Sequence, residues 1–323
     1  MRLRDIVRVR AFVAGATGVL GRRIVRQLVA RGHSVVGLAR SAASEATVRS
    51  MGGEPRRADL FDAGALAKAA EGCDVIVRAA TAIPTKVRTG PTDWAMNDRI
   101  RREGTSSLVT AAARVGARAF LQESIVWAVG TLDGSPFDED APPAADPVLA
   151  SALDGERIAR EAGASQGFDT LTLRCGGFYS ADSWHTRILA ESMAKGRPVL
   201  IGRRSPVWSL IHTDDAASAF VTAAETPKTG VWHVVDDRPV PLSAFLGELA
   251  MRLGARSPRR MPRWLARVFL GRYGTRILSS SFSTSNARFR RDFGWRPSFP
   301  TYREGIEEIA AAWKAEGFPH GRA

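Results

Sequence analysis

Three glycines, Gly15, Gly18 and Gly21, separate a short apolar segment from an amphipathic one. Residues 9–14 are compact and apolar, as in a strand, and residues 19–30 repeat apolar side chains at helical spacing. Glycines in this position allow a tight turn, a close approach of the backbone to a pyrophosphate, and close packing of helix on strand. The sequence therefore predicts a dinucleotide-binding loop. The residues expected to contact the cofactor here are Gly15, Ala16, Thr17, Gly18, Val19, Leu20 and Gly21.

The rest of the first half alternates β-branched runs with helical segments. Strands are expected at residues 34–39, 74–79, 119–123 and 170–174, and a helix at residues 105–115. Such alternation is typical of a parallel sheet that is covered by helices on both faces. The pattern predicts an α/β fold with a Rossmann-type, doubly wound parallel sheet.

Beyond residue 174 the expected elements are shorter and contain many Pro, Gly and Arg residues. We expect residues 1–176, rejoined by residues 207–236, to form the dinucleotide-binding domain. Residues 177–206 and 237–323 are expected to form mainly a smaller C-terminal substrate-binding lobe. In open α/β sheets ligands bind outside the carboxyl ends of the strands, so this lobe is expected to cover that edge.

Arg40 lies 19 residues after Gly21, at the end of the second expected strand. An acidic residue there would bind the ribose 2′-hydroxyl of NAD, whereas a guanidinium pairs with the 2′-phosphate of NADP. The sequence therefore favours NADP(H) over NAD(H), with Arg22 as a further contact and with Asp59 and Leu60 near the adenine. The alternative is that Arg40 is a solvated surface arginine in an arginine-rich chain.

The chain of 323 residues carries 46 basic and 33 acidic side chains, a formal net charge of +13. Most of its basic residues are arginines, and they are spread along the whole chain. Their local clusters lack the interleaved aromatic side chains of a nucleic-acid platform. Nucleic acid is therefore the less favoured alternative, and we expect an anionic small-molecule ligand instead.

Several classes of protein are excluded by what the sequence lacks. No apolar run approaches the ~20 residues that span a bilayer, and residues 1–5 show no secretory signal pattern. The two cysteines, Cys73 and Cys175, are too few for a disulfide framework and have no metal-ligand spacing. We expect a cytoplasmic protein without a membrane span or a metal site. Residues 262–270 form a short basic amphipathic segment that packs on the lobe, roofs a substrate pocket or rests on a membrane surface.

Further motifs follow the glycine loop along nearly the whole chain. They are Asp59-Leu60, Arg78-Ala79-Ala80-Thr81, Asn97 before Gly104-Thr105, Ser124, the segment 173–179, the segment 211–216 and the segment 293–297. Together they resemble the extended short-chain dehydrogenase/reductases, in particular the NAD-dependent epimerase/dehydratase family. The resemblance implies a Rossmann fold and a nicotinamide cofactor, and it places Ala79, Ala80 and Thr81 beside that cofactor.

The chain departs from that family at its catalytic motif, Tyr-x-x-x-Lys. In the family the tyrosine acts as general acid or base, and the lysine lowers the pKa of the tyrosine and holds the nicotinamide ribose. The matching positions here are Val148 and Ala152, and none of the three tyrosines has a lysine four residues later. Valine and alanine transfer no proton, so the family's standard mechanism is excluded.

Replacement catalytic groups are sought near the expected active site. Ser124 matches the family's active-site serine or threonine, and it can bind a substrate carbonyl or hydroxyl or be satisfied by backbone. His185 carries an imidazole that can donate a proton near neutral pH, or it is an ordinary surface residue. Trp127, Tyr179 and Trp184 are expected to line an apolar, aromatic substrate pocket.

Three functions remain open at this point. The preferred one is an atypical NADPH-dependent reductase of a small hydrophobic metabolite, with a non-standard proton donor. The second is a non-redox cyclase, isomerase or lyase of a biosynthetic pathway, in which the dinucleotide is structural. The third is a non-catalytic NADP-sensing regulator, because an intact nucleotide site does not define a reaction. The protein is expected to bind a small-molecule substrate, and a homodimer is possible.

Overall fold

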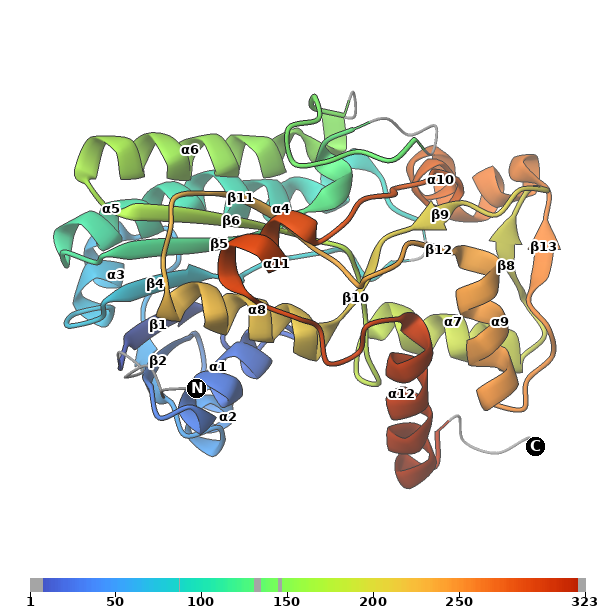
Figure 1. The fold of residues 1–323 in the computed structure, drawn as a ribbon, viewed down its shortest axis with the longest axis horizontal. Coiled ribbons are helices and arrows are strands. Elements are labelled where there is room, and N and C mark those ends of the chain that lie inside the picture. The colour runs from blue at the N-terminus through green and yellow to red at the C-terminus, as the bar shows by residue number, and fades with distance from the viewer. Residues whose placement is uncertain (1–7, 87, 131–134, 145–146, 319–323) are drawn as a thin grey trace.

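The centre of the molecule is a seven-stranded sheet (Figure 1), seen in a computed structural model that describes residues 8–86, 88–130, 135–144 and 147–318. Its order is β3-β2-β1-β4-β5-β6-β11, and all neighbouring strands are parallel. The strands are β1 (Arg10–Ala14), β2 (Ser34–Ala39), β3 (Glu54–Arg57), β4 (Val75–Arg78), β5 (Ala119–Ile125), β6 (Asp169–Cys175) and β11 (Gly230–Val234). The strand order reverses between β1 and β4, which is the point where open α/β sheets bind ligands.

Helices cover both faces of the sheet (Figure 1). One layer consists of α1 (Gly21–Ala30), α2 (Ala42–Ser50) and α8 (Thr213–Glu225), and the other of α3 (Ala63–Ala69), α5 (Thr105–Arg114) and α6 (Ala150–Gln166). Each layer has its own apolar core, since Leu121 and Phe220 pack in the first and Phe120 and Leu108 in the second. The predicted Rossmann-type, doubly wound α/β fold is confirmed.

One helix begins earlier than its apolar pattern predicts. The helix expected at residues 105–115 is preceded without a break by α4 (Ala95–Arg99) and by a π-helical turn, η2 (Ile100–Gly104). Such turns usually represent a local insertion and are frequent at functional sites. The turn lies against α6, where a Cβ on Gly155 would come within 2.8 Å of the Arg101 carbonyl oxygen. The Arg101 side chain is thereby brought to α6.

The smaller lobe lies beyond the carboxyl ends of the strands (Figure 1). It contains three two-stranded sheets, β7–β10, β8–β13 and β9–β12. Trp313, Leu246 and Ile306 lie in its separate apolar core. The elements are β7 (Gly177–Tyr179), α7 (Trp184–Ala194), β8 (Pro198–Ile201), β9 (Val207–Trp208), β10 (Leu210–His212), β12 (Val240–Pro241), α9 (Leu242–Arg252), β13 (Arg259–Met261), α10 (Arg263–Ser279) and α12 (Tyr302–Glu316). Short helical turns occur at η1 (Pro91–Trp94), η3 (Val126–Ala128) and η4 (Pro147–Leu149).

One late segment belongs to the sheet rather than to the lobe. α11 (Ala287–Phe293) lies within residues 237–323, but Phe289 and the following Trp295 pack in the same core as α8. We keep the predicted division of the chain as a proposal, with this segment returned to the dinucleotide-binding side. The N-terminal residues 1–5 lie outside the described residues. Within the described part of the chain, no helix combines the length and the apolarity needed to cross a bilayer.

Candidate functional site

The glycine loop runs from the end of β1 into α1 at the switch point. Gly15 has φ +90°, and a Cβ at this residue would lie 2.6 Å from the Ala80 nitrogen. A Cβ on Gly21 would lie 2.0 Å from the Gly15 carbonyl oxygen. Gly18 and Thr17 are exposed at the tip of the loop. Packing therefore requires Gly15 and Gly21, whereas Gly18 leaves the backbone open to a ligand.

The N-terminus of α1 is prepared for an anion. No side chain caps it, and its first turn contains no acidic residue, so its N–H groups and the helix dipole face the loop. The neighbouring Arg22 and Arg23 both bind the Asp182 carboxylate, and Arg23 also donates to Asp214 at 2.6 Å. An Arg22 contact with a cofactor phosphate would compete with Asp182.

The other residues predicted to contact the cofactor follow neighbouring strands. The Ala79 nitrogen donates to the Ala14 carbonyl at 2.9 Å, so the segment after β4 lies against the glycine loop. Thr81 is exposed one residue beyond Ala80. After β3, Asp59 is exposed and Leu60 is buried. The sheet thus places these residues at one edge, and their contacts with a cofactor remain predictions.

Arg40 immediately follows β2 and is exposed. Its guanidinium has no carboxylate within ion-pair distance among the described residues. Arg57, which ends the neighbouring strand, lies opposite Ala39 in the register and pairs with Glu45. Two guanidiniums therefore stand at the end of β2 and β3. The sequence did not draw attention to Arg57, because only strand pairing reveals that it lies beside the end of β2.

Ser124 lies at the end of β5 and is buried in a polar network. Its hydroxyl donates to Glu156 Oε1 at 2.5 Å. Arg174 holds the same carboxylate with two N–H groups, at 2.9 Å to Oε1 and 2.7 Å to Oε2, and its third nitrogen donates to the Glu139 carbonyl at 2.9 Å. The hydroxyl hydrogen of Ser124 is therefore committed to Glu156, and its oxygen is left to accept.

Further buried charges surround this network. Arg78 donates to the Glu123 and Ala80 carbonyls, and burial lowers the pKa of Arg78 to about 10. Arg101 is 4% exposed, donates to Ser151 at 3.5 Å, and has no carboxylate within 4 Å among the described residues. Burial raises the pKa of Glu123, and the positive charges of Arg78 and Arg101 oppose this shift. We call Arg78, Arg101, Glu123, Glu156 and Arg174 the buried charge cluster.

The positions that replace the catalytic tyrosine and lysine lie beside this cluster. Val148 is in η4 and Ala152 is in the first turns of α6. Ala152 is buried among Ile125, Ala128 and Leu149. Neither side chain can ionise, so the carboxyl end of β5 has guanidiniums and carboxylates in a place where the family motif supplies a phenol and an ammonium group.

His185 is turned inward at the start of α7. Its Nε2 binds the Phe178 carbonyl and lies 2.9 Å from Ser183 Oγ. Burial lowers the pKa of His185 below its ordinary value, although the bond to the carbonyl opposes this shift. The imidazole is thus neutral near pH 7, and a neutral imidazole is a very weak acid. The role of His185 as a proton donor stays a prediction.

The three predicted substrate-binding aromatics lie in different surroundings. Trp127 is half-buried, with its ring 5.6 Å from that of Phe282. Trp184 is 37% exposed at the start of α7. Tyr179 is buried in the lobe core, and its hydroxyl donates to Asp236 at 2.9 Å. Tyr179 therefore has a packing role in this structure, and its predicted contact with substrate stays untested.

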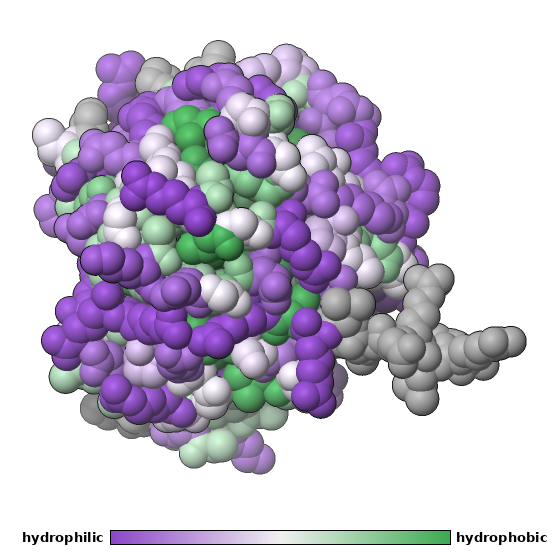
Figure 2. All heavy atoms as spheres, turned by 90° about the vertical axis from the view of Figure 1, so that its left-hand side faces the viewer, coloured by the Kyte–Doolittle hydropathy of each residue, from purple (hydrophilic) through white to green (hydrophobic). Residues whose placement is uncertain are grey.

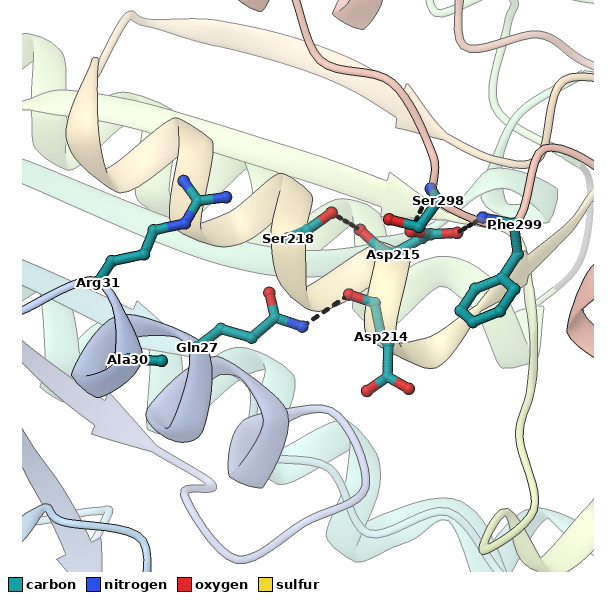
Figure 3. Close-up of a pocket in the computed structure, with 8 residues that line it drawn as sticks. All are labelled: Gln27, Ala30, Arg31, Asp214, Asp215, Ser218, Ser298 and Phe299. Carbon is teal, nitrogen blue, oxygen red and sulfur yellow. Dashed lines mark hydrogen bonds between the residues drawn. The ribbon is translucent and has the colours of Figure 1, made fainter. Parts of the chain in front are cut away.

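A surface hollow of about 290 Å³ lies between α1, α8 and residues 298–299 (Figure 3). The Asp215 carboxylate accepts from the Ser298 and Phe299 nitrogens at 2.7 and 2.8 Å, and Gln27 donates to the Asp214 carbonyl at 2.9 Å. These polar groups satisfy one another, so the hollow is a packing junction rather than part of the candidate active site.

The sheet and its glycine loop define a Rossmann-type protein of the short-chain dehydrogenase/reductase kind. Residues 11–235 match the NAD dependent epimerase/dehydratase family, and the protein belongs to that family. The predicted family resemblance is confirmed. Val148 and Ala152 make this chain an atypical member.

Two relatives and two solved structures extend the comparison. A 3-diazoavenalumate denitrifying reductase of a Streptomyces species is 36% identical over 307 residues, covering 92% of this chain and 99% of the relative. A 4-hydroxy-2-methyl-3-oxo-4-farnesyl-3,4-dihydroquinoline-1-oxide ketoreductase of Stigmatella aurantiaca is 29% identical and covers 73% of this chain and 71% of its own. The fold is shared with a dTDP-glucose 4,6-dehydratase of Streptomyces venezuelae with bound NAD (TM-score 0.79, 22% identity, 95% and 98% of the chains). It is also shared with the human epimerase family protein SDR39U1 with NADPH (TM-score 0.79, 21% identity, 94% and 99%).

Proposed function

We propose that the protein is an NADPH-dependent reductase of a small, acidic and largely apolar metabolite that carries a diazo group. The observation that carries the proposal is the Ser124 hydroxyl, which binds Glu156 and is not free to donate to a substrate. The names of two relatives support reductase chemistry, since one is a denitrifying reductase of a diazo compound and the other a ketoreductase.

Reduction of a carbonyl group would need a proton donor at this site. A carbonyl that accepts hydride becomes an alkoxide, and a general acid normally protonates it. Val148 and Ala152 supply no acid, and the charge-assisted bond from Ser124 to Glu156 is stronger than an ordinary hydrogen bond. Arg174 donates two N–H groups to the same Glu156 carboxylate, so this carboxylate is bound on both oxygens and holds the Ser124 hydroxyl in place. The site is therefore poorly suited to an acceptor that must be protonated.

A diazo group in its cationic diazonium form needs no acid. A carbon that bears N₂⁺ and accepts a hydride becomes a C–H carbon and releases N₂, and the charges balance without a proton. NADPH, when bound, supplies that hydride. The loss of both the tyrosine and the lysine is compatible with this reaction, whereas it would disable a ketone reduction.

The buried charge cluster favours a substrate that also carries an anionic group. It contains three guanidiniums and two carboxylates, and Arg101 has no carboxylate within 4 Å among the described residues. A substrate carboxylate would satisfy that guanidinium and offset the excess charge. We assign Arg101 to the anionic group of the substrate, and Trp127 to its apolar body.

The residues at the switch point fit a nicotinamide dinucleotide. The open backbone at Gly18 and the uncapped N-terminus of α1 suit the pyrophosphate. Arg40 and Arg57, at the ends of neighbouring strands, suit the 2′-phosphate that distinguishes NADPH from NADH. We therefore propose NADP(H) as the preferred cofactor.

The decisive experiment supplies 3-diazoavenalumate and NADPH that carries deuterium at the transferable position. We expect N₂ release and one deuterium on the carbon that held the diazo group. Product without label would indicate a non-redox enzyme, binding of NADPH without turnover would indicate a sensor, and turnover of ketones alone would indicate a ketoreductase. Each of these results overturns the proposal.

A matched variant tests the role of Ser124 in the same assay. Loss of a general acid costs about 10²–10⁴-fold in rate. We expect Ser124→Ala to lower kcat less than about tenfold, because the hydroxyl positions the site without donating a proton to the substrate. A loss above a hundredfold would make Ser124 the proton donor and contradict the proposed chemistry.

A further inference from the structure

Two stretches of the lobe contain no acidic residue at all. Residues 249–286 contain eight arginines, and residues 192–213 contain one lysine and three arginines. The fold brings both stretches together, because β13 pairs with β8 and α10 packs on β8. The result is one continuous basic face, which we call the β8–β13–α10 face.

Among the described residues, no carboxylate lies within 4 Å of the guanidiniums of β13 or of Arg263, Arg267 and Arg272 on α10. Arg259 and Arg260 donate to the Gly196 and Gly202 carbonyls, both at 3.1 Å, and these are neutral groups. Arg267 and Arg272 are exposed on α10, and neither forms an ion pair with a described residue. The face therefore attracts anions from solution, and attraction of this kind weakens as salt is added.

The same face exposes large apolar side chains. Trp264 is 68% exposed, Val268 57% and Phe269 58%, while Ala266 is the buried contact of this part of the helix. At about 100° per residue, Trp264, Val268 and Phe269 lie along one broad side, and Arg263 and Arg267 form its edge. At the far end of the molecule the surface is mostly hydrophilic, with apolar residues scattered among polar ones (Figure 2).

We propose that the β8–β13–α10 face docks the protein on an anionic lipid surface. A helix with tryptophan and phenylalanine on one side and arginines beside them inserts its apolar residues between headgroups, while the arginines bind lipid phosphates. A second copy of the chain is a poor occupant, because a symmetric dimer would bring two basic faces together. A nucleic acid or another soluble polyanion would use the arginines and leave the three apolar side chains in water.

The test is flotation of the full chain with vesicles of phosphatidylcholine, alone or with about a third phosphatidylglycerol. We expect binding to the anionic vesicles and little to the neutral ones, with loss of binding at high salt. The variants Trp264→Ser/Phe269→Ser and Arg267→Glu/Arg272→Glu should each weaken binding more than about tenfold, since each basic residue near an anionic surface contributes several-fold. NADPH affinity, measured in parallel, should not change and reports that each variant is folded.

Two control variants match these changes elsewhere in the chain. Met251→Ser removes an apolar side chain that is 63% exposed on α9, and Arg26→Glu reverses an exposed charge on α1. Both should bind vesicles within about twofold of the unmodified protein. Absence of binding, equal binding to neutral vesicles, or binding that survives Trp264→Ser/Phe269→Ser would overturn the proposal; the last result would point to a soluble polyanion or an acidic protein.

Discussion

Glu156→Gln removes the charge from the carboxylate that holds both Ser124 and Arg174. The ion pair is buried, with side-chain exposures of 8% for Arg174 and 5% for Glu156. Loss of one partner of such a pair destabilises a protein by about 3–5 kcal/mol, because the other charge stays buried without compensation. We expect the free energy of unfolding to fall by that amount. A protein whose stability is near the middle of the typical range of about 5–15 kcal/mol stays folded after a loss of this size.

Urea unfolding of four proteins measures this prediction. They are the unmodified chain, Glu156→Gln, Arg174→Met and the double variant. The double variant removes both charges, so it should lose less stability than the sum of the two single variants, with a coupling of at least about 1–3 kcal/mol. Glu161→Gln is the matched control on α6, since it breaks only an exposed pair with Arg157 at i, i+4 and should cost less than about 0.5 kcal/mol. A Glu156→Gln change below 1 kcal/mol, or additive single effects, would refute the reasoning.

Three further predictions concern single arginines and one histidine. Arg40→Ala should weaken NADPH binding by about 10–100-fold in a fluorescence titration and leave NADH binding unchanged, because it removes a charge-assisted contact to the 2′-phosphate. An unchanged ratio of NADPH affinity to NADH affinity would show that Arg40 does not select the cofactor. Arg101→Met should raise KM for an acidic diazo substrate at least about tenfold with kcat within a few-fold, and Arg101→Lys should restore part of it; a fall in kcat at constant KM would contradict a binding role. Burial lowers the pKa of His233 from its ordinary 6.5 to about 3. The folded protein therefore favours the neutral imidazole, and this contribution to stability is complete above pH 6.5. As the pH falls from 6.5 towards 3, the contribution is lost at about 1.4 kcal/mol per pH unit. The variant His233→Asn should therefore show a flatter fall in unfolding free energy between pH 6 and pH 4 than the unmodified protein, and parallel curves would show that His233 does not titrate in this way.

The fold was predictable because its signals are local. Gly21, the last glycine of the loop, lies only eleven residues after Arg10, the first residue of β1. The strand β2 has the bounds that its β-branched pattern predicts. The π-helical turn at Ile100–Gly104 was not predicted, because periodicity does not reveal one inserted residue in a helix. α11 was grouped with the lobe for a similar reason, since the packing of Phe289 against the sheet is set by tertiary contacts and not by its own sequence.

The candidate site was predictable only in part. The sequence singled out Ser124, but its partner Glu156 lies 32 residues away and its charge is balanced by Arg174 from another strand. In the sequence, Arg101 is part of the dipeptide Arg101-Arg102, and arginines are so frequent in this chain that none of them is distinctive. Burial is what separates Arg78, Arg101 and Arg174 from the other arginines, and burial follows from the assembled sheet and α6.

The buried network also bears on what it would take to return this site to carbonyl reduction. A tyrosine at position 148 and a lysine at position 152 would restore the side chains of the family motif, but not their surroundings. Ala152, however, is buried with Ile125 and Leu149, so a lysine side chain would overpack this small core. The buried Arg101 guanidinium lies nearby, on the adjacent Ser151. Positive charge nearby would repel the new ammonium group, and the Ser124 hydrogen would still be held by Glu156. The departure from the family therefore involves more than two substituted positions. Under the proposed function, the buried charges that surround these two positions suit an acceptor that needs no proton.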